Sequence, residues 1–380
     1  MRSILFSRIA PAAAAALICA AASAAGINAG ERRADPDQPF VASPVASFTV
    51  PWAVAFLPDG RMLVTEKRGR LYLVTQRGEK REVAGVPKVV YQGQNGLLDV
   101  APSPGFARDR TIYLSYVEPA KGGGGQLALA RARLQEGGGD RLDGLAVIWR
   151  ANGAASGGQP GGIIAFAPDG RHLFLTSGDR MAPDTAQDPD SAQGKVLRLL
   201  PDGGTPPDNP WVRAGGVRAQ TWTLGHRNPY GLAFAPDGKL WLNEMGPRGG
   251  DELDLLRPGL NYGWPLVSKG INYNGTPIPD HDTRPDFAAP VVYWTPVIAP
   301  AGMAFYTGDL FPDWKGSAFI GGLRGETLVR IAFDGKGGAD QAQRWDMGHR
   351  IRDVAVAADG ALWVLEDGND GRLLRLTPGG

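Results

Sequence analysis

Apolar and polar positions alternate within a short unit that recurs along the chain. The clearest copies read AFLPDGRMLVTE from Ala55, AFAPDGRHLFLTSGD from Ala165, AFAPDGKLWLNEMG from Ala233 and AVAADGALWVLEDG from Ala355. Each copy places an Asp-Gly pair between two apolar runs, and glycine readily adopts the positive φ that a two-residue hairpin turn requires. The pattern therefore predicts four β-hairpins with two-residue turns.

Two weaker copies bring the number of units to six. They begin at Val100, in VAPSPGFARDRTIYLSY, and at Met303, in MAFYTGDLFPDWKGSAFIGGL. Successive units are far enough apart for a four-stranded sheet and a long loop, and the 54 glycines and 31 prolines indicate frequent turns. Radial repetition of such units predicts an all-β fold, a six-bladed β-propeller of four-stranded antiparallel blades over residues 46–380. A β-sandwich with coincidental hairpins is the alternative.

The first 25 residues have the composition of a cleavable secretory signal. MRSILFSRIAPAAAAALICAAASAA carries Arg2 and Arg8, an alanine-rich apolar run and a small-residue ending. A retained membrane anchor is the less favoured interpretation, because the run is short and Pro11 interrupts it. We therefore expect a secreted or periplasmic protein without a membrane span after cleavage, with a polar leader over residues 26–45.

Composition excludes several kinds of chemistry and partner. The sole cysteine, Cys19, lies inside the predicted signal, so the mature chain has no thiol for a disulfide, a nucleophile or a metal ligand. The 40 Lys and Arg nearly balance the 39 Asp and Glu, which argues against nucleic acid or an anionic membrane as a partner. The oligomeric state has no signature in the sequence.

One loop combines carboxylates with flexible backbone. The stretch EMGPRGGDELDLLRPGLNYGWP, residues 244–265, offers hard oxygen ligands from Asp251 and Glu252 beside Gly246, Gly249 and Gly250. The residues alone leave two interpretations open, a cation site and an ordinary capped turn.

Several motifs together give the chain a family resemblance. They are GQNGLLDVA, SGDR at 177–180, GKVLRL at 194–199, GHRNPYGLAF, the loop at 244–265, INYNG at 271–275, YWTP at 293–296 and RIRDV at 350–354. In these motifs the chain resembles the soluble quinoprotein sugar dehydrogenases, the glucose/sorbosone dehydrogenase family of six-bladed propellers that use pyrroloquinoline quinone (PQQ) and calcium. The resemblance implies a secreted enzyme that oxidises an aldose, or a related alcohol or aldehyde, and passes the electrons to an external acceptor.

The resemblance also implies a set of cofactor-binding residues. Arg350 and Arg352, two positions apart on one strand and so on one face, would bind carboxylates of PQQ, and Arg324 is a further candidate. Hydrogen bonds to the quinone and the substrate would come from Gln94, Arg227 and Asn228. Trp294 and Tyr273 could stack on a sugar or on the planar quinone, or they could pack between blades.

Two calcium sites follow from the same resemblance. The backbone carbonyls of Gly246 and Pro247 would bind the calcium that bridges to the cofactor. Glu252 and Tyr262 match the position of a second, structural calcium, and Asp251 is a candidate third ligand.

The catalytic base departs from the family pattern. In the family the base is a histidine in a segment of the form His-x-x-Gly-Arg, and here the segment reads GGQPGGIIAF, with Gln159 in place of the histidine and Ile163 in place of the arginine. A carboxamide has no useful basicity near neutral pH, and loss of a general base typically slows a reaction about 10²- to 10⁴-fold. His281, in PIPDHDTRPDF, is the first candidate for a replacement base, and Arg227 would assist the reaction.

Other interpretations remain beside this one. Asp99 and Asp179 are acidic candidates that could equally cap backbone amides. A propeller that binds PQQ or sugar without turnover is favoured by Gln159. A calcium-dependent lactonase-like hydrolase would need carboxylates converging on the metal, and would not need Arg350, Arg352 or Gln94.

Overall fold

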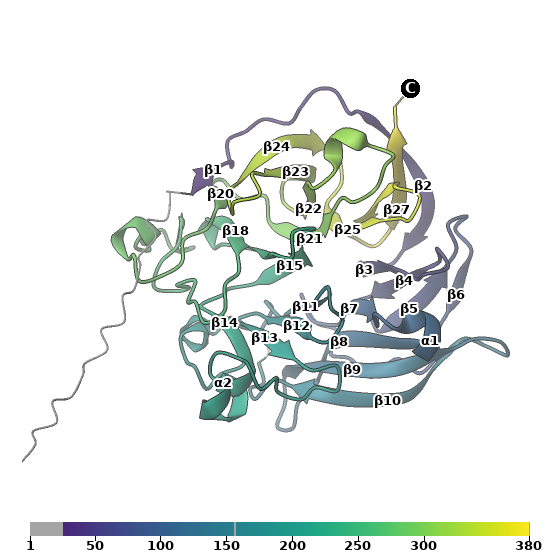
Figure 1. Ribbon diagram of the computed structural model, residues 1–380, viewed down its shortest axis with the longest axis horizontal. Coiled ribbons are helices and arrows are strands. Elements are labelled where there is room, and N and C mark those ends of the chain that lie inside the picture. Colours follow the sequence, from purple (N-terminus) through teal and green to yellow (C-terminus); the bar gives the residue numbers. More distant parts are fainter. Residues whose placement is uncertain (1–25, 156, 380) are drawn as a thin grey trace, which may run out of the picture.

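The computed structural model describes residues 26–155 and 157–379, and the predicted signal lies outside this part of the chain. Six antiparallel sheets are arranged radially around a central channel (Figure 1). The predicted six-bladed β-propeller is therefore confirmed. Blade one contains β3 (Pro51–Phe56), β4 (Met62–Glu66), β5 (Arg70–Val74) and β6 (Lys80–Glu82). Blade two contains β7 (Leu97–Pro102), β8 (Thr111–Pro119), β9 (Gly125–Gln135) and β10 (Arg141–Arg150). Blade three contains β11 (Gly161–Phe166), β12 (Leu173–Ser177), β13 (Lys195–Leu199) and β14 (Thr221–Leu224).

The other three blades complete the ring. Blade four contains β15 (Pro229–Phe234), β16 (Leu240–Glu244), β18 (Asp251–Leu255), β20 (Val292–Trp294) and the added β1 (Ile27–Asn28). Blade five contains β21 (Pro300–Phe305), β22 (Ala318–Gly322), β23 (Thr327–Phe333) and β24 (Ala339–Asp346). Blade six contains β25 (Ile351–Val356), β26 (Leu362–Glu366), β27 (Gly371–Pro378) and β2 (Phe40–Phe48). Short elements lie in the connections: β17 (Arg248–Gly249), β19 (Gly270–Ile271), α1 (Phe106–Asp109), α2 (Gly216–Gln220) and the 3₁₀ turns η1 (Pro183–Ala186), η2 (Val212–Ala214), η3 (His281–Thr283) and η4 (Pro312–Trp314). None of the helices within the described ranges is long and apolar enough to cross a membrane.

The six recurring units are the first two strands of the six blades, but their turns are longer than predicted. In blade one the Leu57 N–H donates to the Arg61 carbonyl at 2.7 Å, so Pro58, Asp59 and Gly60 form a three-residue connection. Gly60 has φ +82°, as the Asp-Gly pair predicts. The Asp59 carboxylate accepts the Arg61 N–H at 3.1 Å and closes the turn.

The chain closes the ring by pairing its two ends. β2 is the outer strand of blade six and pairs antiparallel with β27. The propeller therefore begins at or before Phe40, within the segment that the sequence assigned to a leader. β1 adds a short parallel pairing to β20 of blade four, so the residues between β1 and β2 run along the outside of blades four to six.

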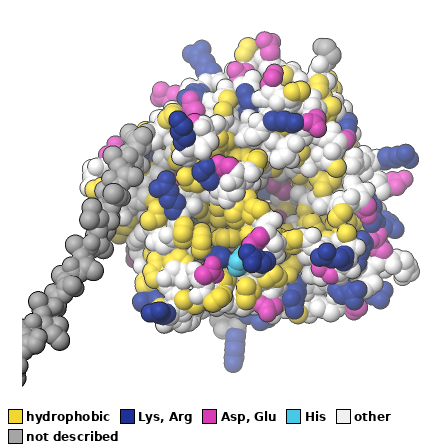
Figure 2. Space-filling model, viewed as in Figure 1, with side chains coloured by type: hydrophobic (Ala, Val, Ile, Leu, Met, Phe, Trp, Pro, Cys, Tyr) yellow, Lys and Arg dark blue, Asp and Glu magenta, His cyan; other side chains and the backbone are white. Residues whose placement is uncertain are grey.

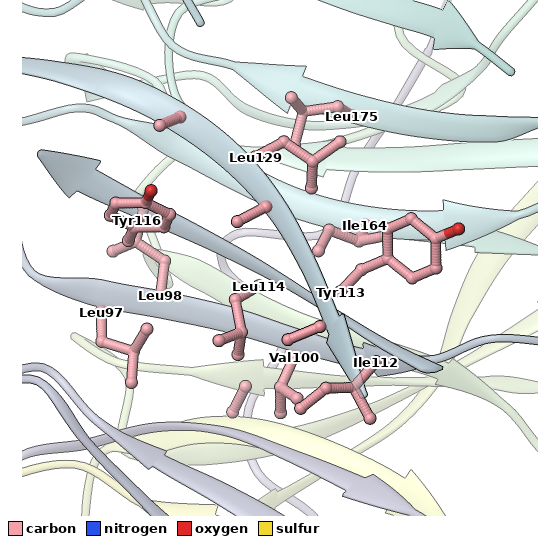
Figure 3. Packing of buried hydrophobic residues seen from close by; sticks show 14 of the residues in the cluster. Leu97, Leu98, Val100, Ile112, Tyr113, Leu114, Tyr116, Leu129, Ile164 and Leu175 are labelled. Atoms are coloured by element: carbon pink, nitrogen blue, oxygen red, sulfur yellow. The ribbon is translucent and has the colours of Figure 1, made fainter. Parts of the chain in front are cut away.

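The core lies between neighbouring blades. The second strand of each blade is buried on both faces, which explains why β4, β12 and β26 are apolar runs without strict alternation. Figure 3 shows the interface of blades two and three, where side chains that include Leu114, Leu129 and Leu175 gather. The space-filling view shows apolar side chains around a central hollow (Figure 2).

The channel has two chemically different mouths. In each blade the innermost strand begins where the antiparallel second strand ends, and the hairpin turn between them lies at the other mouth. Side chains from all six innermost strands line a central cavity of about 220 Å³. Any residue just before an innermost strand, or just after a second strand, therefore lies at the mouth opposite the Asp-Gly turns.

Candidate functional site

The predicted polar residues meet at that opposite mouth. Gln94 and Gln159 lie just before the innermost strands β7 and β11, and Arg227 and Asn228 lie just before β15. Arg350 immediately precedes β25. Loops far apart in the sequence thus converge because each occupies the same position in its own blade.

Arg350 and Arg352 share one carboxylate at this mouth. The Arg350 Nε lies 3.0 Å and the Arg352 Nη2 lies 3.1 Å from Asp367 Oδ2. Burial opposes ionisation of Asp367, but the two guanidinium groups outweigh it and hold the pKa of this carboxyl below its usual value. Arg352 is buried with its guanidinium 4.4 Å from the centre of the Trp52 ring, whereas Arg350 is 47% exposed. Two cations against one anion leave a net positive charge.

Two further cations lie beside this pair. Lys67 lies in the turn after β4, and burial and the nearby Arg352 and Arg350 lower its pKa. Its Nζ donates to the Gly93 carbonyl at 3.2 Å. Arg324 is exposed in the β22–β23 turn, next to Leu323, whose carbonyl accepts from Arg350. Arg324 thus lies at the same mouth as the arginine pair, and its predicted binding of PQQ stays a prediction. Lys67 was missed, although a lysine directly after a second strand was the available signal.

Gln159 occupies the centre of a hydrogen-bonded group. Its N–H donates to Gln94 Oε1, which also accepts from the Tyr230 hydroxyl at 3.2 Å. In the amide orientation that satisfies both neighbours, the Gln159 nitrogen donates to Asp179 and its oxygen accepts from Arg227 Nη2 at 2.8 Å. Gln159 is buried and has φ +54°, a left-handed conformation that costs free energy for a non-glycine residue. The predicted neighbours Gln94, Gln159 and Arg227 are brought together.

Asp179 lies behind Gln159 rather than at the open mouth. Its Oδ2 accepts from the Trp264 indole at 2.8 Å and its Oδ1 accepts from the Met181 N–H at 2.9 Å. Burial raises the pKa of Asp179 to about 6, against the opposing effects of these hydrogen bonds and of Arg227. Asp179 therefore caps backbone and also contacts the amide that stands in the place of the family base.

Asp99 does not belong to this group. It lies in the channel wall, where its two oxygens accept from the Val100 N–H at 2.8 Å and the Ile164 N–H at 2.7 Å. The structure thus supports its interpretation as a backbone cap, here one that joins blades two and three.

Arg227 reaches the predicted calcium ligand. Its Nη1 donates to the carbonyls of Gly246 at 2.7 Å and Met245 at 3.0 Å. Its guanidinium also lies near the rings of Trp264 and Tyr273, at 5.4 Å and 5.8 Å from their centres. Tyr273 is 69% exposed, so an aromatic face borders the site at its solvent side.

One of the two predicted ligands of the first calcium, the Gly246 carbonyl, lies at this mouth. A side chain at this position would collide with the carbonyls of Gly249 and Gly250, so only glycine lets the loop fold back this closely. The Gly246 carbonyl accepts a hydrogen bond from the positively charged Arg227 guanidinium. Pro247 is buried beside it, and its predicted role stays a prediction.

Asp251 has a structural function that the sequence did not indicate. Its Oδ1 accepts the Gly246 N–H at 2.9 Å, and its Oδ2 accepts the Ile298 and Ala299 N–H groups at 2.8 and 2.7 Å. Three backbone amides bind this carboxylate, which argues against the predicted role of Asp251 as a calcium ligand. It fixes the loop that presents the Gly246 carbonyl.

The second predicted calcium site is only partly assembled. Glu252 and Tyr262 both border a small cavity of about 10 Å³, about the volume of one water-sized sphere. The Tyr262 hydroxyl is unsuitable as a ligand because it donates to the Leu255 carbonyl at 2.7 Å and accepts from the Arg257 N–H at 3.0 Å. Its carbonyl faces His281 Nε2 at 3.1 Å. A calcium bound by Glu252 and the Tyr262 carbonyl stays a prediction.

The structure argues against two predictions about the site. Trp294 lies on the outer strand β20, fully buried between blades four and five, and its indole donates to Gln341 Oε1 at 2.9 Å. It therefore packs between blades and does not bind the cofactor. His281 is buried against the Tyr262 carbonyl, with its pKa lowered by burial, and it does not contact Gln159. Its burial and this hydrogen bond argue against His281 as the replacement base.

The fold and the site together define a six-bladed propeller with an arginine-rich polar mouth. Comparison with known proteins shows which family of propellers this is. Residues 48–375 match the model of the Glucose / Sorbosone dehydrogenase family, and the chain belongs to that family. It is 41% identical over 336 residues to the aldose sugar dehydrogenase YliI of Escherichia coli (strain K12), covering 86% of this chain and 90% of that protein. It is 28% identical over 408 residues to the quinoprotein glucose dehydrogenase B of Acinetobacter calcoaceticus, covering 85% and 84%.

Solved structures agree with this assignment. The apo-form of the soluble aldose sugar dehydrogenase from Escherichia coli has a TM-score of 0.84 at 38% identity, covering 90% of this chain and 100% of that chain. The PQQ-bound form of the aldose sugar dehydrogenase from Streptomyces coelicolor has a TM-score of 0.71 at 30% identity, covering 90% and 99%. The predicted family and the predicted enzyme class, a sugar dehydrogenase, are confirmed.

Proposed function

We propose that this protein is a PQQ- and calcium-dependent aldose dehydrogenase that passes electrons from a sugar, or from a related alcohol or aldehyde, to an external acceptor. The observation that carries the proposal is the cluster of cations at one mouth of the channel. Lys67, Arg227, Arg350 and Arg352 converge there from blades one, three to four and six. PQQ has three carboxylates, and such a ligand needs several fixed cations.

Other polar atoms of the mouth support the same ligand. The Asn228 Oδ1 is buried without a hydrogen-bond partner among the described residues, and a buried acceptor of this kind costs free energy until a donor reaches it. Gly246 offers a carbonyl of the kind that calcium prefers. When bound, PQQ would supply the two-electron oxidant. Arg350 and Arg352 would hold its carboxylates, and Arg227 would hold an oxygen of the substrate or the quinone.

The proton of the sugar hydroxyl has no strong base to receive it. Gln159 occupies the family's histidine position and can only donate and accept hydrogen bonds. Among the described residues, the buried carboxylate of Asp179 is the one that contacts the Gln159 amide. We therefore propose a slow dehydrogenase, whose turnover rate is roughly 10²- to 10⁴-fold lower than that of an enzyme with an imidazole base.

One observation favours a second candidate, a propeller that binds PQQ without turnover. Both ends of the Gln159 amide are satisfied by Asp179 and Arg227, so this side chain has no free group directed at a substrate. The lactonase-like alternative gains no such support, because the chain belongs to a dehydrogenase family and retains the arginine pair.

The deciding experiment uses purified mature protein stripped of metal. It is titrated with PQQ with and without calcium, and dye reduction is then followed with a panel of aldoses. Calcium-dependent binding with sugar-driven reduction supports the dehydrogenase. Tight binding without reduction supports the binding propeller, and absence of binding contradicts both. Arg375→Met is a control for binding at the arginine pair, because Arg375 pairs with Asp359 of an Asp-Gly turn at the other mouth. This variant should bind PQQ as the parent protein does.

We also propose that residues 1–25 direct export and are then removed. The charged start, the alanine-rich run and the small residues at 22–24 support this proposal. Amino-terminal sequencing of protein from the extracytoplasmic fraction should begin near Ala25 or Gly26. An intact amino terminus in the cytosolic fraction would contradict it.

A further inference from the structure

A cluster of buried acids lies beneath the mouth, in blade four. Glu244 and Glu252 are directly opposite each other on β16 and β18, and Asp254, two residues further along β18, points to the same face of the sheet. Glu244, Glu252 and Asp254 are all buried. Three carboxylates gathered in this way require compensating positive charge or protons.

A histidine completes the cluster. His226, from the loop between β14 and β15, is fully buried, and its Nδ1 lies 2.8 Å from Glu244 Oε1. Its Nε2 lies 2.9 Å from Thr223 Oγ1. The ring of Tyr262 stacks on the imidazole with 5.0 Å between ring centres and seals this side from solvent. One potential ligand atom from each of His226, Glu244 and Asp254 lies within 4.8 Å of the other two.

Asp254 gives an independent indication that the cluster lacks a component. The residue has no exposed surface, and neither of its carboxylate oxygens has a hydrogen-bond partner among the described residues. Glu244, by contrast, is satisfied by His226 and by the N–H groups of Arg227 and Asn228. A buried carboxylate aimed at an imidazole and a second carboxylate, with nothing bonded to it, has the chemistry of an unfilled ligand.

We propose that His226, Glu244 and Asp254 bind a divalent metal ion of the Zn²⁺ type. Ligand atoms around a tetrahedral zinc with bonds of about 2.1 Å lie roughly 3.4 Å apart, so small side-chain rotations would bring the three donors to bonding distance. An imidazole nitrogen among the donors favours zinc over calcium, which takes oxygen ligands. The site is thus distinct in its donors from both calcium sites that the family resemblance implies.

Such an ion would tie the loop before β15 to two strands of blade four. That loop carries Arg227 and Asn228 directly after His226, so the metal would brace the residues that face the proposed cofactor. The inference does not depend on the proposed function, because the site is built from buried residues below the mouth. It can be tested without PQQ and without measuring turnover.

The test uses tag-free, PQQ-free mature protein that has been treated with a chelator and then titrated with Zn²⁺. We expect one zinc per chain, and a thermal midpoint that rises by about 3–5 °C at a free zinc concentration of roughly 100 times Kd. Asp254→Asn keeps the side-chain shape and should weaken zinc binding by roughly 100-fold, because it removes a charged ligand. Equal zinc affinity in Asp254→Asn and the parent protein would overturn the proposal.

Two controls separate this site from others. His349→Asn removes an exposed imidazole and should leave zinc binding unchanged, and loss of binding there would assign the ion to the surface and overturn the proposal. If Asp254→Asn does not fold, X-ray absorption of the zinc-loaded parent protein decides. A shell with one imidazole supports the site, and a shell of oxygen atoms alone overturns it. Displacement of zinc by an equal concentration of calcium would also overturn it.

Discussion

In the amide orientation that satisfies both neighbours, the Gln159 side-chain oxygen accepts a hydrogen bond of 2.8 Å from Arg227 Nη2 and its nitrogen donates to Asp179. An imidazole at the same position would meet the same two neighbours, a carboxylate behind it and a guanidinium beside it. The framework for a general base is therefore present although the base itself is absent. The slow turnover that we propose would therefore follow from the residue at position 159 and not from the surrounding site.

Gln159→His should raise the rate of sugar-driven dye reduction by up to about 10²- to 10⁴-fold, because it supplies a base that Asp179 can orient. Histidine is among the residues that tolerate the left-handed backbone found here, with φ +54°. The measurement is kcat/KM for aldoses with a soluble dye as acceptor. Gln159→Asn is the matched control and should bring no gain. An unchanged rate for Gln159→His would show that the missing base does not limit turnover.

Arg352→Met should weaken PQQ binding by roughly 10- to 100-fold, because a charge-assisted hydrogen bond is worth about 1.5–3 kcal/mol. The Asp367→Asn variant tests the same charge from the other side. It removes the anion that both arginines contact, so PQQ should bind at least as tightly as to the parent protein. Affinity measured by absorbance titration checks both. Weaker binding in Asp367→Asn would show that this carboxylate is needed to position the pair.

Local sequence patterns predicted the hairpins of the fold better than its closure. In the four blades that carry an Asp-Gly pair, short turns join the first two strands, and the pattern is visible within about a dozen residues. β1 and β2 pair with β20 and β27, which lie far away in the chain. No local pattern encodes such pairings, so the sequence alone places residues 40–45 in the leader.

The sequence predicted the site residues that belong to a motif. It did not predict the residues whose positions depend on how the blades pack. Arg350 and Arg352 belong to a motif, and the structure places them together on Asp367. Lys67 joins them only because blade six closes against blade one, a contact between the two ends of the propeller. The burial of His281 and Trp294 was not predictable in this way, because burial in a long loop or an outer strand depends on residues distant in the sequence.

The stability of the fold should decrease as pH rises from about 5 to 8. Burial raises the pKa of Asp99 to about 8 and that of Asp353 to about 7, while an unfolded aspartate titrates near 4. Between these values the folded chain binds more protons than the unfolded chain, so raising the pH favours unfolding, by at most about 1.4 kcal/mol per pH unit for each group. The free energy of unfolding from urea titrations at pH 5 and pH 8 measures the slope.

Asp99→Asn isolates one of these two groups. The amide cannot ionise, so the pH dependence should become flatter than in the parent protein. At pH 5 the variant should be less stable by about 1–3 kcal/mol, because an amide oxygen can replace only one of the two acceptors that bind Val100 and Ile164. A slope that is unchanged in Asp99→Asn would mean that this carboxyl is not protonated in the folded channel.

Two aromatic substitutions should have opposite effects on stability and binding. Trp294→Phe removes an indole hydrogen bond to Gln341 inside a closed interface, so it should lower the free energy of unfolding by about 1–3 kcal/mol and leave PQQ affinity unchanged. Tyr273→Ala alters an exposed ring beside Arg227, so stability should change by less than about 0.5 kcal/mol while KM for the sugar rises. Urea unfolding and steady-state kinetics on both variants make the comparison. Loss of PQQ affinity in Trp294→Phe at unchanged stability would return this tryptophan to the cofactor site, because a residue that only packs between blades cannot act on the ligand without first weakening the fold.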